Sequence, residues 1–430
     1  MDQTYISFEI RKLIRQKFFL LLALVISIFL LVGFVYQFYA QKQFLNFYRN
    51  EIDKQILANK RDVHVDGNTR QIFNRMYQRE LQDLKNPAQY FKGYFRSIEN
   101  NQGIIRQASV LPYSANTVGF DVNYFSNGTT NPSLGWLDGS NSSDSIETQS
   151  TAKEMSIIKN KKLYFLYPSR LLSNETIFNN YISAPNTLGL NYNTRIHNYQ
   201  KSARLYLSRF YTYGWNYLYS ILQNQFLPLI FYFSLILVFT YYLVSEFQNS
   251  LSGTWLLTQK ISKKKFFFVK YAISLISSML LVVIPAGILI FITFCLGRSG
   301  SLNYPIFFWK NDPLQAGYYF KTIGSSLLVA LPIVLLTVAF LLSLVFLFGV
   351  WFQQIWATAI FCSLILFSSM FINHWIYVPI TYFNTSQAID GYSYFQAGSG
   401  NQSLTMLILL TATTICLLIG YLIFNKKRSI

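Results

Sequence analysis

The sequence predicts an α-helical polytopic membrane protein with six transmembrane helices, an N-terminal interfacial helix and a mixed α/β extracellular domain between helices 1 and 2. Two observations predict this class. Of the 430 residues, 52% are hydrophobic and only 13% are charged, whereas soluble domains carry roughly 25% charged residues. Residues 322–389 contain no Asp, Glu, Lys or Arg. A soluble fold needs charge on such a long segment, but a lipid-facing bundle does not.

Six apolar segments are long enough for the predicted spans, since crossing a bilayer takes about 20 residues. The predicted transmembrane helices cover residues 18–40, 226–245, 271–297, 322–350, 355–372 and 403–424. We do not expect the first segment to be a cleaved signal peptide. Its apolar core is too long, and no small-residue cleavage site follows it.

Basic residues set the predicted orientation, because Lys and Arg concentrate in cytosolic loops. One side holds the basic residues of 11–17, 260–265 and 426–428, and the short loops on the other side hold only Arg298, Lys310 and Lys321. Both termini are therefore predicted to lie in the cytosol and the protein in the cell membrane. The cytosolic parts are then residues 1–17, 246–270, 351–354 and 425–430, and the extracellular parts are 41–225, 298–321 and 373–402.

The N-terminal segment 5–17 places isoleucines and a leucine near one face of a helix and its basic residues elsewhere. This pattern is typical of an amphipathic helix that lies on the inner leaflet. The residues assigned to this interfacial helix are Ile10, Arg11, Lys12, Ile14 and Arg15. The alternative is a simple positively charged flank of the first span.

The extracellular segment 41–225 is long enough for a domain of its own. Its first part has a polar helical pattern, and its middle is rich in Gly, Asn and Ser, which predicts loops and short strands. Residues 161–172 are a candidate strand, and 201–223 are predicted to be helical. With 21 Lys and Arg against 13 Asp and Glu, the segment carries a net charge of +8 (21 − 13). It suits anionic headgroups or an acidic cell-wall polymer, and the alternative is a solvated surface without a ligand.

No catalytic, cofactor-binding or metal-ligating residues are predicted, and the chain is not expected to be an enzyme. It contains neither a P-loop nor an H-E-x-x-H motif, and its three histidines have no metal spacing. Cys295, Cys362 and Cys416 fall in apolar runs, so the polar segment has no disulfide framework. The spans also lack the ionisable residues of ion-driven carriers, because Glu246 and Lys270 stand only at span ends.

The cytosolic segment 246–270 combines apolar and basic residues. Leu251, Trp255 and Leu256 have helical spacing, so a short amphipathic helix parallel to the membrane is expected to press them into a groove of a partner. Lys263, Lys264 and Lys265 would hold the next span at anionic headgroups, at about 1 kcal/mol each. The alternative is an ordinary basic turn that follows the positive-inside rule.

This segment resembles the coupling-helix loop of ABC-2 type permeases, the membrane subunits of bacterial ATP-binding cassette exporters. The loop of that family runs from a Glu through a Gly and a Leu pair to Pro-hydrophobic-Ser-basic, a Phe-rich start and a Lys. The matching residues are Glu246, Gly253, Leu256, Leu257, Ile261, Ser262, Lys263, Phe266, Phe267, Phe268 and Lys270. Lys260 stands where proline is usual, and the spacing from the Glu to the Leu pair is longer by about one residue. A large outside domain between spans one and two resembles one branch of the family.

The resemblance implies a permease that exports an amphipathic or hydrophobic cargo, such as a peptide, an antimicrobial or a lipid-linked compound. Its implied partners are a cytosolic ABC ATPase dimer, which binds ATP and Mg²⁺ in place of this chain, a second permease chain, identical or related, and membrane lipids. No nucleic acid partner is expected. The residues implied to couple to the ATPase are Glu246, Leu251, Gly253, Trp255, Leu256, Leu257, Thr258, Lys260, Ser262, Lys263, Lys264 and Lys265. The alternative is a non-transporting membrane receptor or bacteriocin-immunity protein with a ligand-binding extracellular domain and no ATPase partner.

Overall fold

The computed structural model describes two compact units of the chain. The described residues are 2–15, 17–61, 153–154, 156–167, 209–224, 226–248, 262–309, 318–372, 375–397 and 400–426, with isolated positions between 67 and 82. One unit, here called the helical unit, comprises Met1–Gly33 and Tyr213–Ile430. The other, called the second unit, comprises Phe34–Thr212.

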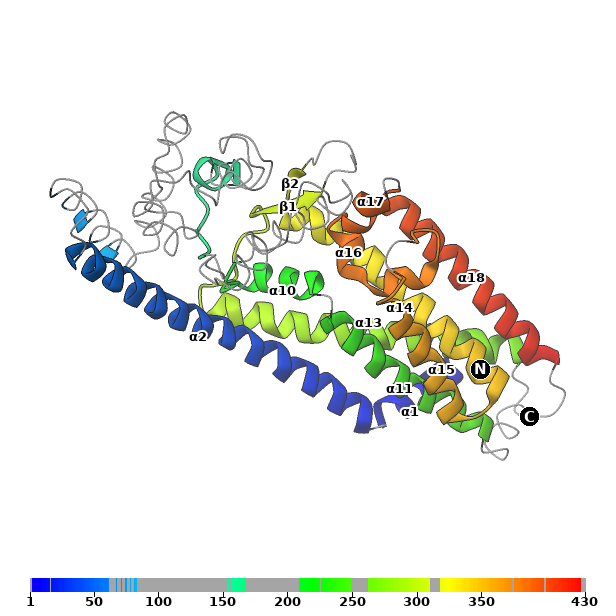
Figure 1. The fold of residues 1–430 in the computed structure, drawn as a ribbon. Coiled ribbons are helices and arrows are strands. Elements are labelled where there is room, and N and C mark those ends of the chain that lie inside the picture. Colours follow the sequence, from blue (N-terminus) through cyan, green and yellow to red (C-terminus); the bar gives the residue numbers. More distant parts are fainter. Residues whose placement is uncertain are drawn as a thin grey trace. The chain divides into compact units, whose positions relative to one another are not determined.

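Among the described residues, five helices are long and apolar enough to cross a membrane (Figure 1). They are α2 (Lys17–Arg61), α11 (Phe226–Gln248), α13 (Lys263–Cys295), α14 (Ile323–Phe352) and α18 (Gln402–Lys426). A shorter helix, α1 (Asp2–Arg15), precedes them. The chain is therefore a helical, multi-pass membrane protein.

The predicted fifth span, 355–372, differs from the structure. The helix in this place, α15, covers only Ile355–Ser368, and its 14 residues reach about 21 Å at about 1.5 Å per residue. That is shorter than the roughly 30 Å hydrocarbon core of a bilayer. The chain tightens after Ser368 into turns with i→i−3 backbone bonds, because Ser369 N donates to Leu366 O and Met370 N to Phe367 O.

The segment after α15 is folded into the bundle, although 373–402 was predicted to be a loop. It forms the 3₁₀ helix η3 (Pro379–Phe383) and the short helices α16 (Thr385–Ile389) and α17 (Tyr392–Ala397). Residues 381–394 are all buried. Phe383 stacks on Phe340, in the middle of α14, with ring centroids 5.5 Å apart. The segment between α15 and α18 is therefore part of the core of the bundle.

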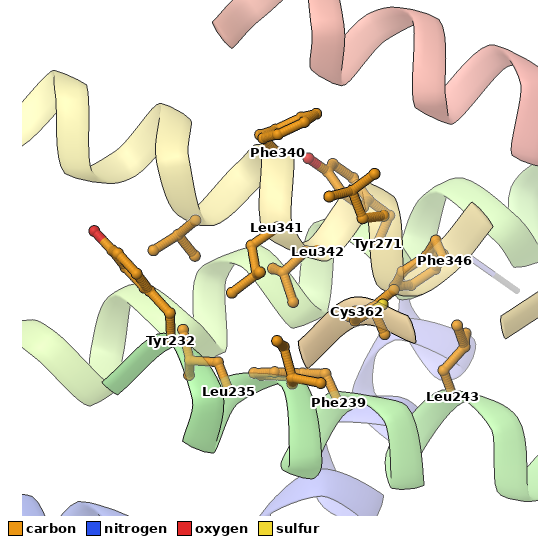
Figure 2. Packing of buried hydrophobic residues seen from close by; sticks show 14 of the residues in the cluster. Tyr232, Leu235, Phe239, Leu243, Tyr271, Phe340, Leu341, Leu342, Phe346 and Cys362 are labelled. Carbon is orange, nitrogen blue, oxygen red and sulfur yellow. The ribbon is translucent and has the colours of Figure 1, made fainter. Parts of the chain in front are cut away.

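The core of the helical unit is centred on α14, which packs against α11, α13, α15 and α18. Figure 2 shows side chains from α11, α13 and α15 meeting around α14. The labelled residues are Tyr232, Leu235, Phe239 and Leu243 of α11, Tyr271 of α13, Phe340, Leu341, Leu342 and Phe346 of α14, and Cys362 of α15. Tyr271 also donates a hydrogen bond of 2.9 Å to Ala339 O, so a polar contact adds to the apolar packing between α13 and α14.

A two-stranded antiparallel hairpin joins α13 to α14, where sequence analysis expected a loop at 298–321. It consists of β1 (Pro305–Trp309) and β2 (Tyr318–Thr322), with Phe307 opposite Phe320. Aromatic side chains favour strands because they fit the pleated surface of a sheet. Thr322 ends the hairpin and caps α14, since its hydroxyl accepts from Ser325 N at 3.2 Å.

In the second unit, the polar pattern after the first predicted span continues as part of α2 up to Arg61. The candidate strand 161–172 is not found in its described part, because residues 161–162 form a turn and 163–167 are irregular. Lys162 has a left-handed φ of 50°, which interrupts an extended chain. Residues 168–172 and the predicted loops and strands of 83–152 lie outside the described residues.

The described part of the second unit contains a buried ion pair. Arg209 Nη2 lies 3.0 Å from Glu154 Oε2, and both side chains are 7% exposed. Next to it, Phe210 N donates to Tyr167 O at 2.8 Å. Of the predicted helix 201–223, residues 209–213 are not helical and Gly214–Gln223 form α10 of the helical unit, whereas 201–208 lie outside the described residues.

Candidate functional site at the basic end of the helical unit

The basic end of the helical unit is the end where α11 and α18 finish and α13 starts, with Lys263, Lys264, Lys265 and Lys426. Ser262 caps α13 here, because its hydroxyl accepts a hydrogen bond of 3.3 Å from Lys265 N. The helix consequently begins at Lys263 rather than at the predicted Tyr271. Movement of the segment before Ser262 would therefore act directly on a membrane-spanning helix.

The first turns of α13 hold an aromatic cluster formed by Tyr5, Phe266, Phe267, Phe346, Tyr421 and Phe424. Phe266 stacks between Tyr5 of α1, at a centroid distance of 6.4 Å, and Phe424 of α18, at 5.8 Å. Phe267 meets Phe346 of α14 edge-on at 5.5 Å and Tyr421 of α18 at 6.0 Å. Two consecutive residues therefore connect the start of α13 to three other helices.

A buried ion pair lies beside this cluster. Glu9 of α1 and Lys270 of α13 are both 0% exposed, and Lys270 Nζ is 3.6 Å from Glu9 Oε2. Tyr242 of α11 donates a hydrogen bond of 2.6 Å to the same carboxylate oxygen. Lys270 Nζ also lies 4.7 Å from the centre of the Tyr242 ring, within the range of a cation–π interaction. The three residues join α1, α11 and α13 at one point.

The ion pair determines which side of α1 faces the protein. Tyr5 and Glu9, one helical turn apart, are buried, whereas Ile6, Phe8 and Ile10 are each more than 40% exposed. The buried side of this helix thus carries its acid. At about 100° per residue, Ile6 and Ile10 lie on one flank of the buried side and Phe8 on the opposite flank, so each flank offers an exposed apolar residue for contact with lipid.

The structure places the predicted interfacial residues as follows. Ile10 and Arg11 are exposed on the outward side of α1. Lys12 is half-buried, with Nζ 5.8 Å from the centre of the Tyr242 ring. Ile14 and Arg15 belong to the helix, but their side chains lie outside the described residues.

The predicted coupling residues are only partly described. Glu246 lies in the last turns of α11, and Ser262, Lys263, Lys264 and Lys265 form the cap and first turn of α13. Outside the described residues are Leu251, Gly253, Trp255, Leu256, Leu257, Thr258 and Lys260. The structure therefore defines both ends of the predicted coupling segment, and the segment joins α11 to α13.

Sequence analysis missed Glu9 and Tyr242, and it treated Lys270 as a residue at a span end and as the last residue of the family's loop pattern. One signal was present: Glu9 is the single acidic residue between Asp2 and Glu51. An acid in an otherwise basic helix indicates a specific cationic neighbour, because buried carboxylates need a partner. The identity of that neighbour, 261 positions away (270 − 9), requires the fold.

Among the described residues, no group of three or more His, Cys, Asp or Glu is placed to hold a metal ion. The comparisons with known proteins give no further assignment. No protein-family model, curated protein or solved structure matches this chain. The class that the fold defines is a multi-pass helical membrane protein.

Proposed function

We propose that the chain is the permease subunit of an ATP-binding cassette exporter that works with a separate ATPase. The observation that carries this proposal is the construction of the basic end. The predicted coupling segment leads directly into α13 at Ser262. The next turns contact α1, α14 and α18 through Phe266 and Phe267. A force applied to that segment would reach four helices at once.

In the proposed mechanism, ATP-driven closure of a cytosolic ATPase dimer pushes on the helix predicted around residues 250–258. Leu256 and Leu257 fill a groove of the ATPase, and α13 transmits the movement to the bundle. Two permease chains, identical or related, form the path. The cargo is amphipathic or hydrophobic, because residues 322–389 offer no charged group to a polar solute.

The charge at the start of α13 supports placing the basic end in the cytosol. Lys263, Lys264 and Lys265 stand at the N-terminus of a helix that has no acid in its first turn. The helix dipole disfavours cations at this position, so the lysines do not stabilise the helix itself. Anionic headgroups of the cytosolic leaflet offset that cost. Both termini then lie in the cytosol, and the protein belongs to the cell membrane.

The first test is purification of the tagged chain in mild detergent from its native host, followed by mass spectrometry. We expect a P-loop ATPase in stoichiometric amount. A reproducible monomer without an ATPase, also after cross-linking, contradicts the proposal.

The coupling role has its own test, the double variant Leu256→Asp/Leu257→Asp. It should abolish ATP-dependent transport while the chain still reaches the membrane. Leu57→Asp is the control, because Leu57 is 53% exposed on α2. Transport at the wild-type rate in the double variant would show that the two leucines do not couple ATP hydrolysis to transport.

The second candidate function is a receptor or immunity protein without transport activity. It is favoured by the second unit, Phe34–Thr212, which is compact on its own and belongs to the segment with a net charge of +8 (21 − 13). Such a protein would bind an extracellular peptide and use the spans as an anchor. Recovery of the chain without any nucleotide-binding subunit supports this function over the first.

A further inference from the structure

We infer that Glu9 is a positioning residue that makes α1 move together with the base of α13 when the predicted coupling segment is pushed. The inference rests on the proposed function and deepens it, because it assigns a role to α1 in the transmission of the force. Glu9 acts through Lys270 and does not itself contact the ATPase or the cargo.

The geometry of the contact supports a fixed connection. Glu9 Oε2 receives the hydrogen bond of Tyr242 at 2.6 Å and the charge of Lys270 at 3.6 Å. Two partners on one oxygen, from two different helices, allow few orientations of the carboxylate. One turn before Lys270, Phe266 stacks on Tyr5 of α1. Two successive turns of α13 are therefore connected to two successive turns of α1.

Stability alone does not account for a buried pair of this kind. Desolvation of two charges offsets most of their attraction, and well-packed apolar residues are often equally stabilising at such a position. Glu9 Oε1 is also buried and accepts no hydrogen bond within the part of the chain that the structure describes. What the pair provides is a defined register of α1 against α13, since an apolar contact would allow the helices to slide.

The exposed residues of α1 hold the helix at the membrane surface while its buried residues contact α13. Ile6, Phe8 and Ile10 are exposed, and Arg11 beside them is exposed as well. Exposed apolar residues on both flanks of the buried side, together with a cation between them, hold a helix in the plane of an anionic membrane surface. With the inward side joined to α13, displacement of the base of α13 has to rotate or shift α1 along that surface.

The test compares hydrogen exchange of the purified complex of permease and ATPase with ATP and Mg²⁺ and without nucleotide. In the wild type, we expect ATP to change amide exchange in both α1 and the first turns of α13. In Glu9→Gln, the change should persist in α13 and disappear from α1. Asp53→Asn is the matched control, because it also removes one negative charge but at an exposed position of α2, and it should behave like the wild type.

A charge-reversed pair separates positioning from general damage to the fold. Glu9→Lys/Lys270→Glu keeps two opposite charges, and the Tyr242 hydroxyl can accept a hydrogen bond from the new lysine. We expect it to restore the response of α1 that each single reversal loses. Melting temperatures are measured in parallel, and a purely structural role predicts that each single reversal loses the response of α1 only in proportion to a loss of melting temperature.

The possible outcomes separate the two proposals. If ATP changes exchange in α13 but not in α1 of the wild type, the role of Glu9 is refuted and the permease assignment stands. The same conclusion follows if Glu9→Gln keeps the response of α1. If no ATPase is recovered or no part of the chain responds to ATP, the permease assignment fails and the inference with it.

Discussion

Phe266 and Phe424 stack almost in parallel, with an angle of 11° between their planes and 5.8 Å between their centroids. This pair joins the first turns of α13 to the last turns of α18. Both rings are nearly fully buried, and Tyr5 of α1 extends the stack on the other side. The end of the chain is thereby attached to the helix that follows the predicted coupling segment.

Removing one ring of this stack should destabilise the basic end. We expect Phe424→Ala to lower the free energy of unfolding by about 1–3 kcal/mol, because the side chains around the cavity it leaves lose packing contacts. This cost remains even though no strong hydrophobic force acts between helices in lipid. Thermal unfolding in detergent measures the effect. Phe291→Ala is the control, since Phe291 of α13 is 68% exposed, and an equal loss in both variants would contradict the importance of the stack.

The ion pair predicts a non-additive stability pattern. Lys270→Met leaves Glu9 buried without its countercharge and should cost about 3–5 kcal/mol. Glu9→Met/Lys270→Met removes both charges and should be close to the wild type in stability, because no unpaired charge is left. Chemical or thermal unfolding of the two variants checks this. A double variant less stable than Lys270→Met would show that the pair itself stabilises the fold.

Gly420 marks a close approach of α18 to its neighbours. A Cβ built at this position would lie 3.4 Å from Leu347 Cα and 3.4 Å from Phe267 Cζ, which is ordinary contact. We therefore expect Gly420→Ala to be tolerated and Gly420→Leu to lose about 1–3 kcal/mol by overpacking. The yield of folded monodisperse protein and its melting temperature distinguish the two. Equal behaviour of both variants would argue against close packing at this point.

Tyr217 of α10 predicts a loss of stability in alkali. Burial raises the pKa of Tyr217 from the model-peptide value of 10.0 to about 12, so the folded state keeps the phenol proton that the unfolded state releases. The contribution of this tyrosine to stability is complete below pH about 10 and is lost as the pH rises towards about 12.

A difference measurement isolates this residue among the 31 tyrosines of the chain. We expect the wild type to lose more stability between pH 10 and 12, the two pKa values above, than Tyr217→Phe does. The tyrosinate absorbance, taken as wild type minus variant, should rise near the upper end of this range. A rise near pH 10 would show that the hydroxyl is solvated.

Sequence analysis could predict the helices with strong hydropathy. The predicted spans 226–245, 322–350 and 403–424 coincide closely with α11, α14 and α18, because long apolar runs form helices in a bilayer. Boundaries set by single polar contacts were missed. The start of α13 depends on the hydroxyl of Ser262. Its first lysines were assigned to the cytosolic loop because a run of charged residues is typical of a loop.

The short fifth helix and the hairpin were missed for another reason. Apolar residues continue beyond Ser368, and hydropathy does not register the change from helix to tight turns that the backbone hydrogen bonds make there. The strands Pro305–Trp309 and Tyr318–Thr322 are five residues long, and periodicity does not separate such short aromatic runs from loops.

The candidate site could be predicted only in part. The Phe-rich start of α13 and Lys270 were noted as sequence features, but their partners Tyr5, Glu9 and Phe424 are contributed by both ends of the chain. Local pattern does not reveal contacts between positions so far apart. Of the predicted apolar residues of α1, Ile6 and Ile10 are exposed, whereas the inward role of its acid was not predicted.

The 14-residue length of α15 has a consequence for how the protein enters the membrane. A helix this short is a poor stop signal for the insertion machinery. The segment after it forms the short helices η3, α16 and α17, whose terminal backbone groups lipid would not tolerate if the bundle did not bury them. η3 and α16 contact α18, which is synthesised after them. We therefore expect α15 and the segment after it to settle only once α18 has arrived, so chains truncated before Gln402 should be degraded or misoriented during biogenesis.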